Sequence, residues 1–211
     1  MGKNFFLDGR ESESWPKKRI LIPEDKRNEI QKYLLEKNVG YLAFLKLIYG
    51  ALIRPKEILM LKVGDVSMVD KTITVRAEVS KNGKQRIVPM SEEIEQLLLK
   101  FNLHRFNAND YVFSVGQKPG KEKVSERAYR KNWDKIRKIF NLPMEMQQYS
   151  LRDTGITEML KNGLDALSVK QLADHHSLEM TTIYSNHADP NLKELVRKKA
   201  PGFSSKSEKQ K

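Results

Sequence analysis

The sequence predicts a mostly helical α+β domain with one small antiparallel β-sheet. Apolar residues recur at helical spacing through most of the chain between residues 20 and 200. Two short runs, Thr72–Ala77 and Gln85–Pro89, read as strands, and the Asn82-Gly83 pair between them is typical of a type I′ hairpin turn. With 211 residues, of which 39% are hydrophobic, the chain can bury a sizeable core.

The segment before the hairpin predicts two long helices and a short one. Pro23 opens the first helix, in which Ile30 and Leu34 lie at helical spacing. Residues 39–52 are apolar nearly all round, so the second helix should be buried. Arg54-Pro55 ends it, and the proline can occupy the first turn of a short third helix.

The segment after the hairpin predicts further helices. Ser91 and Ser125 are expected to cap two of them, the second reaching about residue 140, and Asp110–Phe113 is a short extended segment. Gly163 fits a helix end and Ser168 a helix start. The remaining helices are expected at about 151–161, 168–174, 178–186 and 190–199.

Composition indicates a polyanionic partner. The formal net charge is +12 and the pI is about 9.7, which favours binding to nucleic acid through counterion release. The chain has no cysteine, so disulfides and thiolate metal sites are excluded. It also lacks a signal peptide and any apolar run of membrane-spanning length, so we expect a cytoplasmic protein with no membrane partner.

The chain divides into three parts. Residues 1–19 are polar and charged and are expected to be a linker or the remnant of an upstream domain. Residues 20–200 form the predicted globular domain, and 201–211 a flexible basic tail.

Two arginines, a lysine, a histidine and a tyrosine occur in an order suited to phosphoryl transfer. The arginines are Arg54, in Ile53-Arg54-Pro55-Lys56-Glu57, and Arg152, in Tyr149-Ser150-Leu151-Arg152; the others are Lys81, His175 and Tyr184. Together these motifs resemble the catalytic domain of the tyrosine recombinases, the phage integrase family, over about residues 20 to 200. The resemblance implies the mixed α/β fold of that catalytic domain. It also implies that no metal or nucleotide cofactor is required, because each bond broken is exchanged for a similar one.

The resemblance implies that Tyr184 is the nucleophile, since it follows His175 by the family's spacing of nine residues. His175 would bind a non-bridging phosphate oxygen, and the adjacent His176 is the alternative. Arg54 and Arg152 would form a clamp, because guanidinium groups suit the charge of a phosphoryl transition state. Glu57 would orient Arg54 from one helical turn away. No further residues cluster with the two histidines as metal ligands.

The predicted general acid lies on the hairpin. Lys81 directly precedes the turn and could protonate the leaving 5′ oxygen, with Lys84 as the alternative because hairpins slip in alignment. The remaining candidate DNA-binding residues are basic: Lys84, Arg86, Arg127, Arg130 and Lys131.

Tyr149 is the clear departure from the family pattern. Histidine is the family's most frequent residue three positions before the second arginine, and a phenol with a reference pKa of about 10 is a poor base near neutral pH. Tyr149 could still donate a hydrogen bond to phosphate, position Tyr184, or simply pack. Asp153 follows Arg152 where histidine is also frequent. The proton acceptor for Tyr184 is therefore left open.

The function expected from the resemblance is site-specific recombination through a 3′-phosphotyrosyl intermediate, for DNA integration or excision in a mobile element. The expected partner is double-stranded DNA, bound by a homotetramer whose C-terminal segments are exchanged between neighbours; residues 191–196 and 200–203 are candidates for that segment, and packing in cis is an equal alternative. Two other functions stay open. One is a type IB topoisomerase-like relaxation activity, and the other is a DNA-binding regulator that does not cut.

Overall fold

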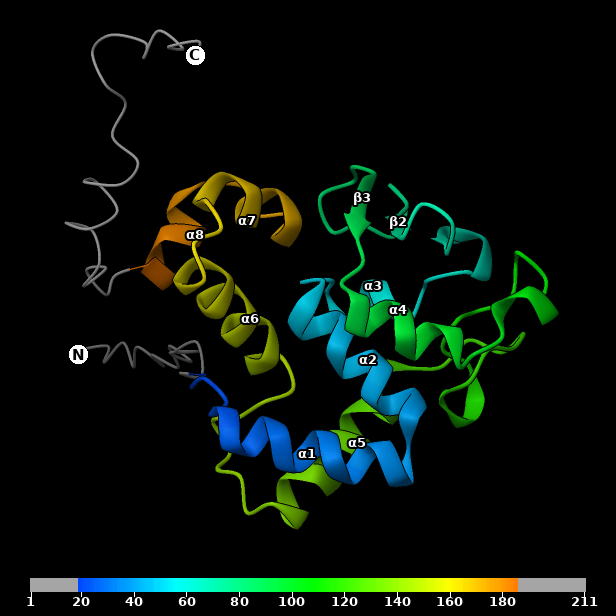
Figure 1. The fold of residues 1–211 in the computed structure, drawn as a ribbon, viewed down its shortest axis with the longest axis horizontal. Helices are drawn as coiled ribbons and strands as arrows, with labels where there is room; N and C mark the ends of the chain where they lie inside the picture. Colours follow the sequence, from blue (N-terminus) through cyan, green and yellow to red (C-terminus); the bar gives the residue numbers. More distant parts are fainter. Residues whose placement is uncertain (1–18, 186–211) are drawn as a thin grey trace, which may run out of the picture.

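The computed structural model describes residues 19–185 (Figure 1). The expected linker at 1–19, apart from Arg19, the helix at 190–199, the exchanged segments and the basic tail lie outside the described residues. The longer helices are α1 (Glu24–Lys37), α2 (Val39–Gly50), α4 (Glu92–Leu99), α5 (Glu126–Ile139), α6 (Ser150–Lys161) and α7 (Ala166–Ala173). The short elements are α3 (Pro55–Ile58), α8 (Glu179–Thr182), the 3-10 turns η1 (Val63–Asp65), η2 (Leu103–Arg105), η3 (Val115–Gln117) and η4 (Ile183–Ser185), and the strands β1 (Val66–Ser67), β2 (Thr72–Val75) and β3 (Arg86–Pro89).

Helix α2 lies at the centre of the core, in contact with α1, α4 and α6 (Figure 1). Its residues are buried on nearly every side, as its apolar sequence predicts; they include Tyr41, Phe44, Leu47 and Ile48. Aromatic rings extend this core, since Phe44 lies 4.4 Å from Tyr129 of α5 and 5.7 Å from Phe113 between ring centroids.

The predicted mixture of helices and a small antiparallel sheet is confirmed. The strand order is β1-β2-β3, with Ile73 opposite both Val66 and Val88. Ile73, Val75 and Val88 are fully buried and join the main core. The two-residue strand β1 is too short for a sequence pattern to reveal it.

The prediction of a type I′ turn is wrong. That turn requires positive φ at both central residues, whereas only Gly83 of the pair has it, at 64°. The strands are separated by residues 76–85, and Asn82 is held by contacts inside and outside this loop. Its main-chain N–H donates to Ser80 Oγ and its side-chain amide donates to the carbonyl of Asp174.

Helix α6 approaches α2 closely because residue 155 is glycine. A Cβ atom there would lie 2.0 Å from the carbonyl oxygen of Tyr49, which no side chain can accept. Beside this crossing, a small second core joins Leu52 to Ile156 of α6 and Val169 and Ala173 of α7. The close α6–α2 crossing and this second core therefore fix the site residues of α6 and α7 relative to the main core.

The ends of α6 and α7 test two capping predictions. Gly163, with φ of 88°, follows the end of α6 as expected. The predicted cap at Ser168 is wrong by one turn: Asp165 caps α7 and accepts the main-chain N–H of Ser168. Aspartate competes well for this position, because its carboxylate accepts the free amides of the first turn.

Candidate active site

Five elements bring the predicted chemical residues into one connected network. Arg54 directly precedes α3, Arg152 lies on α6 and His175 follows α7. Tyr184 lies on η4, and the loop with Lys81 precedes β3. In Figure 1 the sheet and the α7–α8 pair lie at the same end of the molecule, opposite α1 and α5. The network is therefore built at one end of the domain, around the start of α3.

Glu57 organises the cationic side of the site. It is only 1% exposed, and its carboxylate accepts the main-chain N–H of Arg54 at 3.1 Å and Arg54 Nη1 at 3.1 Å. Arg86 binds the same carboxylate through both terminal nitrogens, with Nη2 at 2.5 Å. The main-chain N–H of Lys81 also donates to it, at 3.3 Å. Burial alone would raise the pKa of Glu57, but Arg86 and Arg54 hold it below its ordinary value, so the group is anionic.

Arg152 is held rigidly inside the domain. It is 1% exposed, and its Nη1 donates to the carbonyl of Leu52 at 2.6 Å while Nη2 donates to the carbonyl of Ala173. Leu52 is buried and has φ of 51°, a strained conformation for a bulky residue, so the site stores backbone strain next to this contact. Nε of Arg152 is buried and has no hydrogen-bond partner among residues 19–185. Burial lowers the pKa of this guanidinium, but an arginine still keeps its proton at neutral pH.

Asp174 occupies the free face of Arg54. Its Oδ2 accepts from Arg54 Nη1 at 2.7 Å, and its main-chain carbonyl accepts from Arg54 Nη2 at 2.7 Å. Burial would raise the pKa of Asp174, but the hydrogen bonds from Arg54 and Asn82 lower it. One arm of the predicted clamp is therefore already held by an acidic residue.

His175, rather than His176, lies beside Tyr184. The His175 and Tyr184 rings are nearly parallel, with centroids 6.5 Å apart, whereas His176 is exposed. Nδ1 of His175 lies 3.0 Å from the hydroxyl of buried Thr181. Burial, together with the positive charges of Arg152 and Arg54, lowers the pKa of His175 to about 4. The imidazole is therefore neutral at pH 7, ready to hydrogen-bond an anion.

The hydroxyl of Tyr184 donates a hydrogen bond to a carboxylate. The acceptor is Asp153 Oδ1, at 2.9 Å, and the other oxygen of Asp153 pairs with Arg19 Nε at 2.7 Å. Burial and the adjacent Asp153 raise the pKa of the Tyr184 phenol well above its ordinary value. The free protein thus holds a neutral phenol with a hydrogen-bond acceptor already in place.

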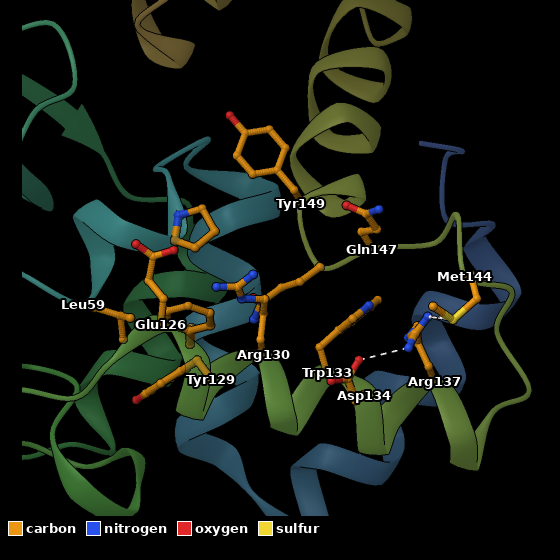
Figure 2. A pocket seen from close by; sticks show the side chains of 13 residues that line it. Leu59, Glu126, Tyr129, Arg130, Trp133, Asp134, Arg137, Met144, Gln147 and Tyr149 are labelled. Atoms are coloured by element: carbon orange, nitrogen blue, oxygen red, sulfur yellow. Dashed lines mark hydrogen bonds and ion pairs between the residues drawn. The ribbon is translucent and has the colours of Figure 1, made fainter. Parts of the chain in front are cut away.

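Tyr149 packs against cations and lies at the edge of an open pocket (Figure 2). The guanidinium carbons of Arg19 and Arg152 lie 4.7 and 5.7 Å from its ring centroid. The pocket has a volume of about 470 Å³. Its other lining residues come mainly from α5 and the segment before α6, and include Arg130, Trp133, Arg137 and Gln147.

The predicted DNA-binding residues fall into two groups. Lys81, Lys84, Arg127, Arg130 and Lys131 are exposed. Neither Lys81 nor Lys84 has an ion pair within residues 19–185, so both ammonium groups are available, and the choice between them stays a prediction. Arg86 instead turns inward, and its guanidinium binds the buried carboxylate of Glu57.

Sequence reasoning did not anticipate the roles of Asp174 and Arg19. Asp174 stands in the Asp174-His175 pair, where the family usually has glycine, and this substitution was the available signal. Arg19 ends a basic run, Lys17-Lys18-Arg19, that carried no such signal. Within the described part of the chain, no three acidic or histidine side chains converge as a metal site, and no helix is long and apolar enough to cross a bilayer.

Comparison with known proteins finds relatives in sequence and in fold. The tyrosine recombinase XerA of Pyrococcus horikoshii is 26% identical over 204 residues, covering 93% of this chain and 70% of that protein. The XerA of Pyrococcus furiosus is 28% identical over 153 residues, covering 72% of this chain but 52% of that protein, so this chain spans only part of such relatives. The solved structure of the Tn1549 transposon integrase in complex with a circular intermediate DNA has the same fold, with a TM-score of 0.70 over 89% of this chain and 67% of that one, at 17% identity.

A profile of the phage integrase family matches residues 21–191, which is most of the chain. This match covers α1 through η4 and therefore every element that contributes to the network described above. The chain belongs to the phage integrase family, whose members are the tyrosine recombinases.

Proposed function

We propose that this protein is a site-specific recombinase that cuts and rejoins DNA strands through a 3′-phosphotyrosyl intermediate. The observation that carries the proposal is the convergence of Arg54, Arg152 and His175 with the hydroxyl of Tyr184 in one contact network. A phosphodiester needs cationic donors for its non-bridging oxygens and a nucleophile that can later depart. This network supplies both from side chains alone.

In the proposed mechanism, Tyr184 attacks the scissile phosphate in line and the P–O5′ bond breaks. Lys81, on the exposed loop, gives a proton to the released 5′ oxygen. The 5′ hydroxyl of a partner strand then attacks the phosphotyrosyl bond and releases Tyr184. Throughout, Arg54 and Arg152 bind the phosphate as a clamp and neutral His175 donates a hydrogen bond to it.

Double-stranded DNA is the proposed partner, and the charge distribution supports it. The net charge is +12, and the exposed face of α5 carries Arg127, Arg130 and Lys131, of which Arg130 lines the pocket of Figure 2. We propose a homotetramer on DNA as the active assembly, with residues 20–200 as its catalytic domain.

Covalent trapping tests this function. The protein would be incubated with nicked duplexes, from which the short cleaved strand is lost by diffusion, and the DNA-bearing peptide would be identified by mass spectrometry. An adduct on Tyr184 is expected. It should disappear in Tyr184→Phe, which still binds DNA, and persist in the matched control Tyr111→Phe, whose ring lies beside Lys62 rather than in the network.

Two outcomes point to the alternatives. Salt-sensitive DNA binding with no adduct on any duplex would indicate a regulator that does not cut. An adduct that rejoins only its own strand, and relaxes supercoiled plasmid without joining a partner strand, would indicate a type IB topoisomerase activity. Joining of the cut strand to a second duplex supports the recombinase.

A further inference from the structure

The nucleophile lacks the family's most frequent neighbouring base. Tyr149 stands where histidine is most frequent, and its phenol is a poor proton acceptor near neutral pH. His175 lies near Tyr184, but its Nδ1 is engaged with Thr181, and the Tyr184 hydroxyl donates to Asp153 instead. A tyrosine that attacks phosphorus must nevertheless transfer its proton to another group.

Asp153 is already in position for that transfer. Its Oδ1 accepts the Tyr184 hydroxyl at 2.9 Å, within the range required of a general base. Asp153 is 6% exposed and lies on α6 directly after Arg152, which is fixed at both terminal nitrogens. The carboxylate is therefore positioned by the same helix that places one arm of the phosphate clamp.

Arg19 holds the second oxygen of this carboxylate. The Nε–Oδ2 distance is 2.7 Å, and the guanidinium also lies over the Tyr149 ring. This pairing leaves Oδ1 to the phenol. The titratable groups facing Asp153 are Arg19 before α1, Tyr149 at the start of α6, His175 after α7 and Tyr184 on η4.

We propose that Asp153 is the proton acceptor for Tyr184 and that Arg19 is its positioning residue; this inference rests on the proposed function. As the Tyr184 Oη–P bond forms, the Oη–H bond breaks and the proton moves to Asp153 Oδ1. The P–O5′ bond breaks and its electron pair is protonated by the general acid. In rejoining, the partner 5′ hydroxyl gives its proton to the deprotonated general acid as its oxygen bonds to phosphorus. The Oη–P bond then breaks, and Asp153 returns its proton to the tyrosine oxygen.

A carboxylate can perform this step because the phenol becomes acidic during the reaction. Before attack, burial and Asp153 itself keep the Tyr184 pKa high, so the proton stays on oxygen. As the oxygen bonds to phosphorus it loses basicity, and transfer to a carboxylate at hydrogen-bond distance becomes favourable. No prior ionisation of the tyrosine is needed.

The contrary reading is that the Tyr184–Asp153 contact restrains an idle nucleophile. The two interpretations predict opposite changes in the cleavage rate when Asp153 is replaced. Loss of a proton acceptor slows cleavage, whereas loss of a restraint accelerates it.

The test uses single-turnover cleavage of the nicked duplex that traps wild-type protein best. Asp153→Asn is nearly isosteric but far less basic, and Asp153→Glu retains the carboxylate. We expect cleavage to fall about 100-fold or more in Asp153→Asn and to recover to within about tenfold of wild type in Asp153→Glu. DNA binding and thermal unfolding should change little in both.

DNA with sulfur at the scissile position distinguishes the loss of the proton acceptor from the loss of the general acid. With sulfur at the bridging 5′ position the leaving group departs without a proton, so Lys81→Ala should be rescued while Asp153→Asn should stay slow. Wild-type rates or faster cleavage in Asp153→Asn, or its rescue by sulfur, would overturn the inference. If wild-type protein forms no adduct, the proposed function is wrong. If wild-type protein forms the adduct and Asp153→Asn forms it equally fast, only the role of Asp153 is wrong.

Arg19→Gln keeps the test decisive if Asp153→Asn does not fold. This variant leaves the acceptor in place but removes the guanidinium that holds its second oxygen. Single-turnover cleavage at saturating DNA should fall about tenfold or more, and Arg19→Lys, which restores a cation, should recover part of the rate. A wild-type or faster rate in Arg19→Gln would refute the assignment.

Discussion

Replacing Asp174 by asparagine should strengthen DNA binding. Asp174 accepts two hydrogen bonds from the Arg54 guanidinium: Nη1 donates to the carboxylate oxygen Oδ2 and Nη2 to the main-chain carbonyl, each at 2.7 Å. The two side chains are only 13% and 14% exposed, so the ion pair is weakly screened. Asp174→Asn removes the charge, keeps an acceptor oxygen, and is compatible with the φ of 53° at this position.

The size of the effect follows from what the phosphate must displace. A hydrogen bond to a charged group contributes about 1.5–3 kcal/mol, and the displaced carboxylate would also repel the incoming anion. Removing the charge should therefore improve binding by at least about 1.4 kcal/mol, which is tenfold in Kd. The dependence of affinity on salt should steepen by about one counterion.

Fluorescence anisotropy with a labelled nicked duplex, over a series of salt concentrations, measures both quantities. Asp165→Asn is the matched control, because it makes the same charge change at the other end of α7 and asparagine also caps helices. Asp165 is fully exposed and lies on no part of the network. Equal affinities for Asp174→Asn and wild type, or equal gains in the two variants, would refute the reasoning that Asp174 competes with phosphate for Arg54.

Three further outcomes are expected. Gly155→Ala should lower the free energy of unfolding by about 1–3 kcal/mol or more, because its methyl group meets a backbone carbonyl, whereas Gly50→Ala, where the nearest atom is 3.4 Å away, should change it little in thermal melts. Arg152→Lys should reduce cleavage about 100-fold despite its charge, because an ammonium cannot bridge the carbonyls of Leu52 and Ala173; full activity would refute the clamp. The folded pKa of His175, about 4, lies below its ordinary 6.5, so its contribution to stability is present above pH 6.5 and is lost as pH falls toward 4. After allowance for the ring's partial exposure, about 1 kcal/mol should disappear between pH 7 and 5, and His175→Asn should show less of this loss in denaturant titrations.

The sequence predicted those parts of the fold that depend on local pattern. Helix α2 is apolar on all sides and is buried, and α5 begins after its serine cap. The hairpin turn was mispredicted because the side chain of Asn82 is hydrogen-bonded to Asp174, which lies 92 residues away along the chain. The preference of a residue pair for a turn type reflects only neighbouring residues and does not account for such a contact.

The candidate site divides in the same way. Spaced motifs predict roles for Arg54, Arg152, His175 and Tyr184, because each motif carries its own local signature, and the structure brings these residues to one end of the domain. The carboxylates that hold these groups were not assigned, since the Arg54–Asp174 and Arg19–Asp153 pairs join positions 120 and 134 residues apart. The packing of α6 against α2, and of α7 against α6, brings them together.

Asp174 and Asp153 should give opposite results in one assay, although both are acidic residues paired with an arginine. Asp174 lies against the guanidinium that phosphate must reach, so its charge opposes substrate binding. Asp153 lies against the attacking hydroxyl, so its charge assists the reaction once substrate is bound. Cleavage measured at subsaturating DNA should therefore rise in Asp174→Asn and fall in Asp153→Asn, whereas at saturating DNA only the second change should persist. Two variants that move together at both concentrations would mean that the site responds to net charge alone, and the separate functions assigned to the two carboxylates would fail.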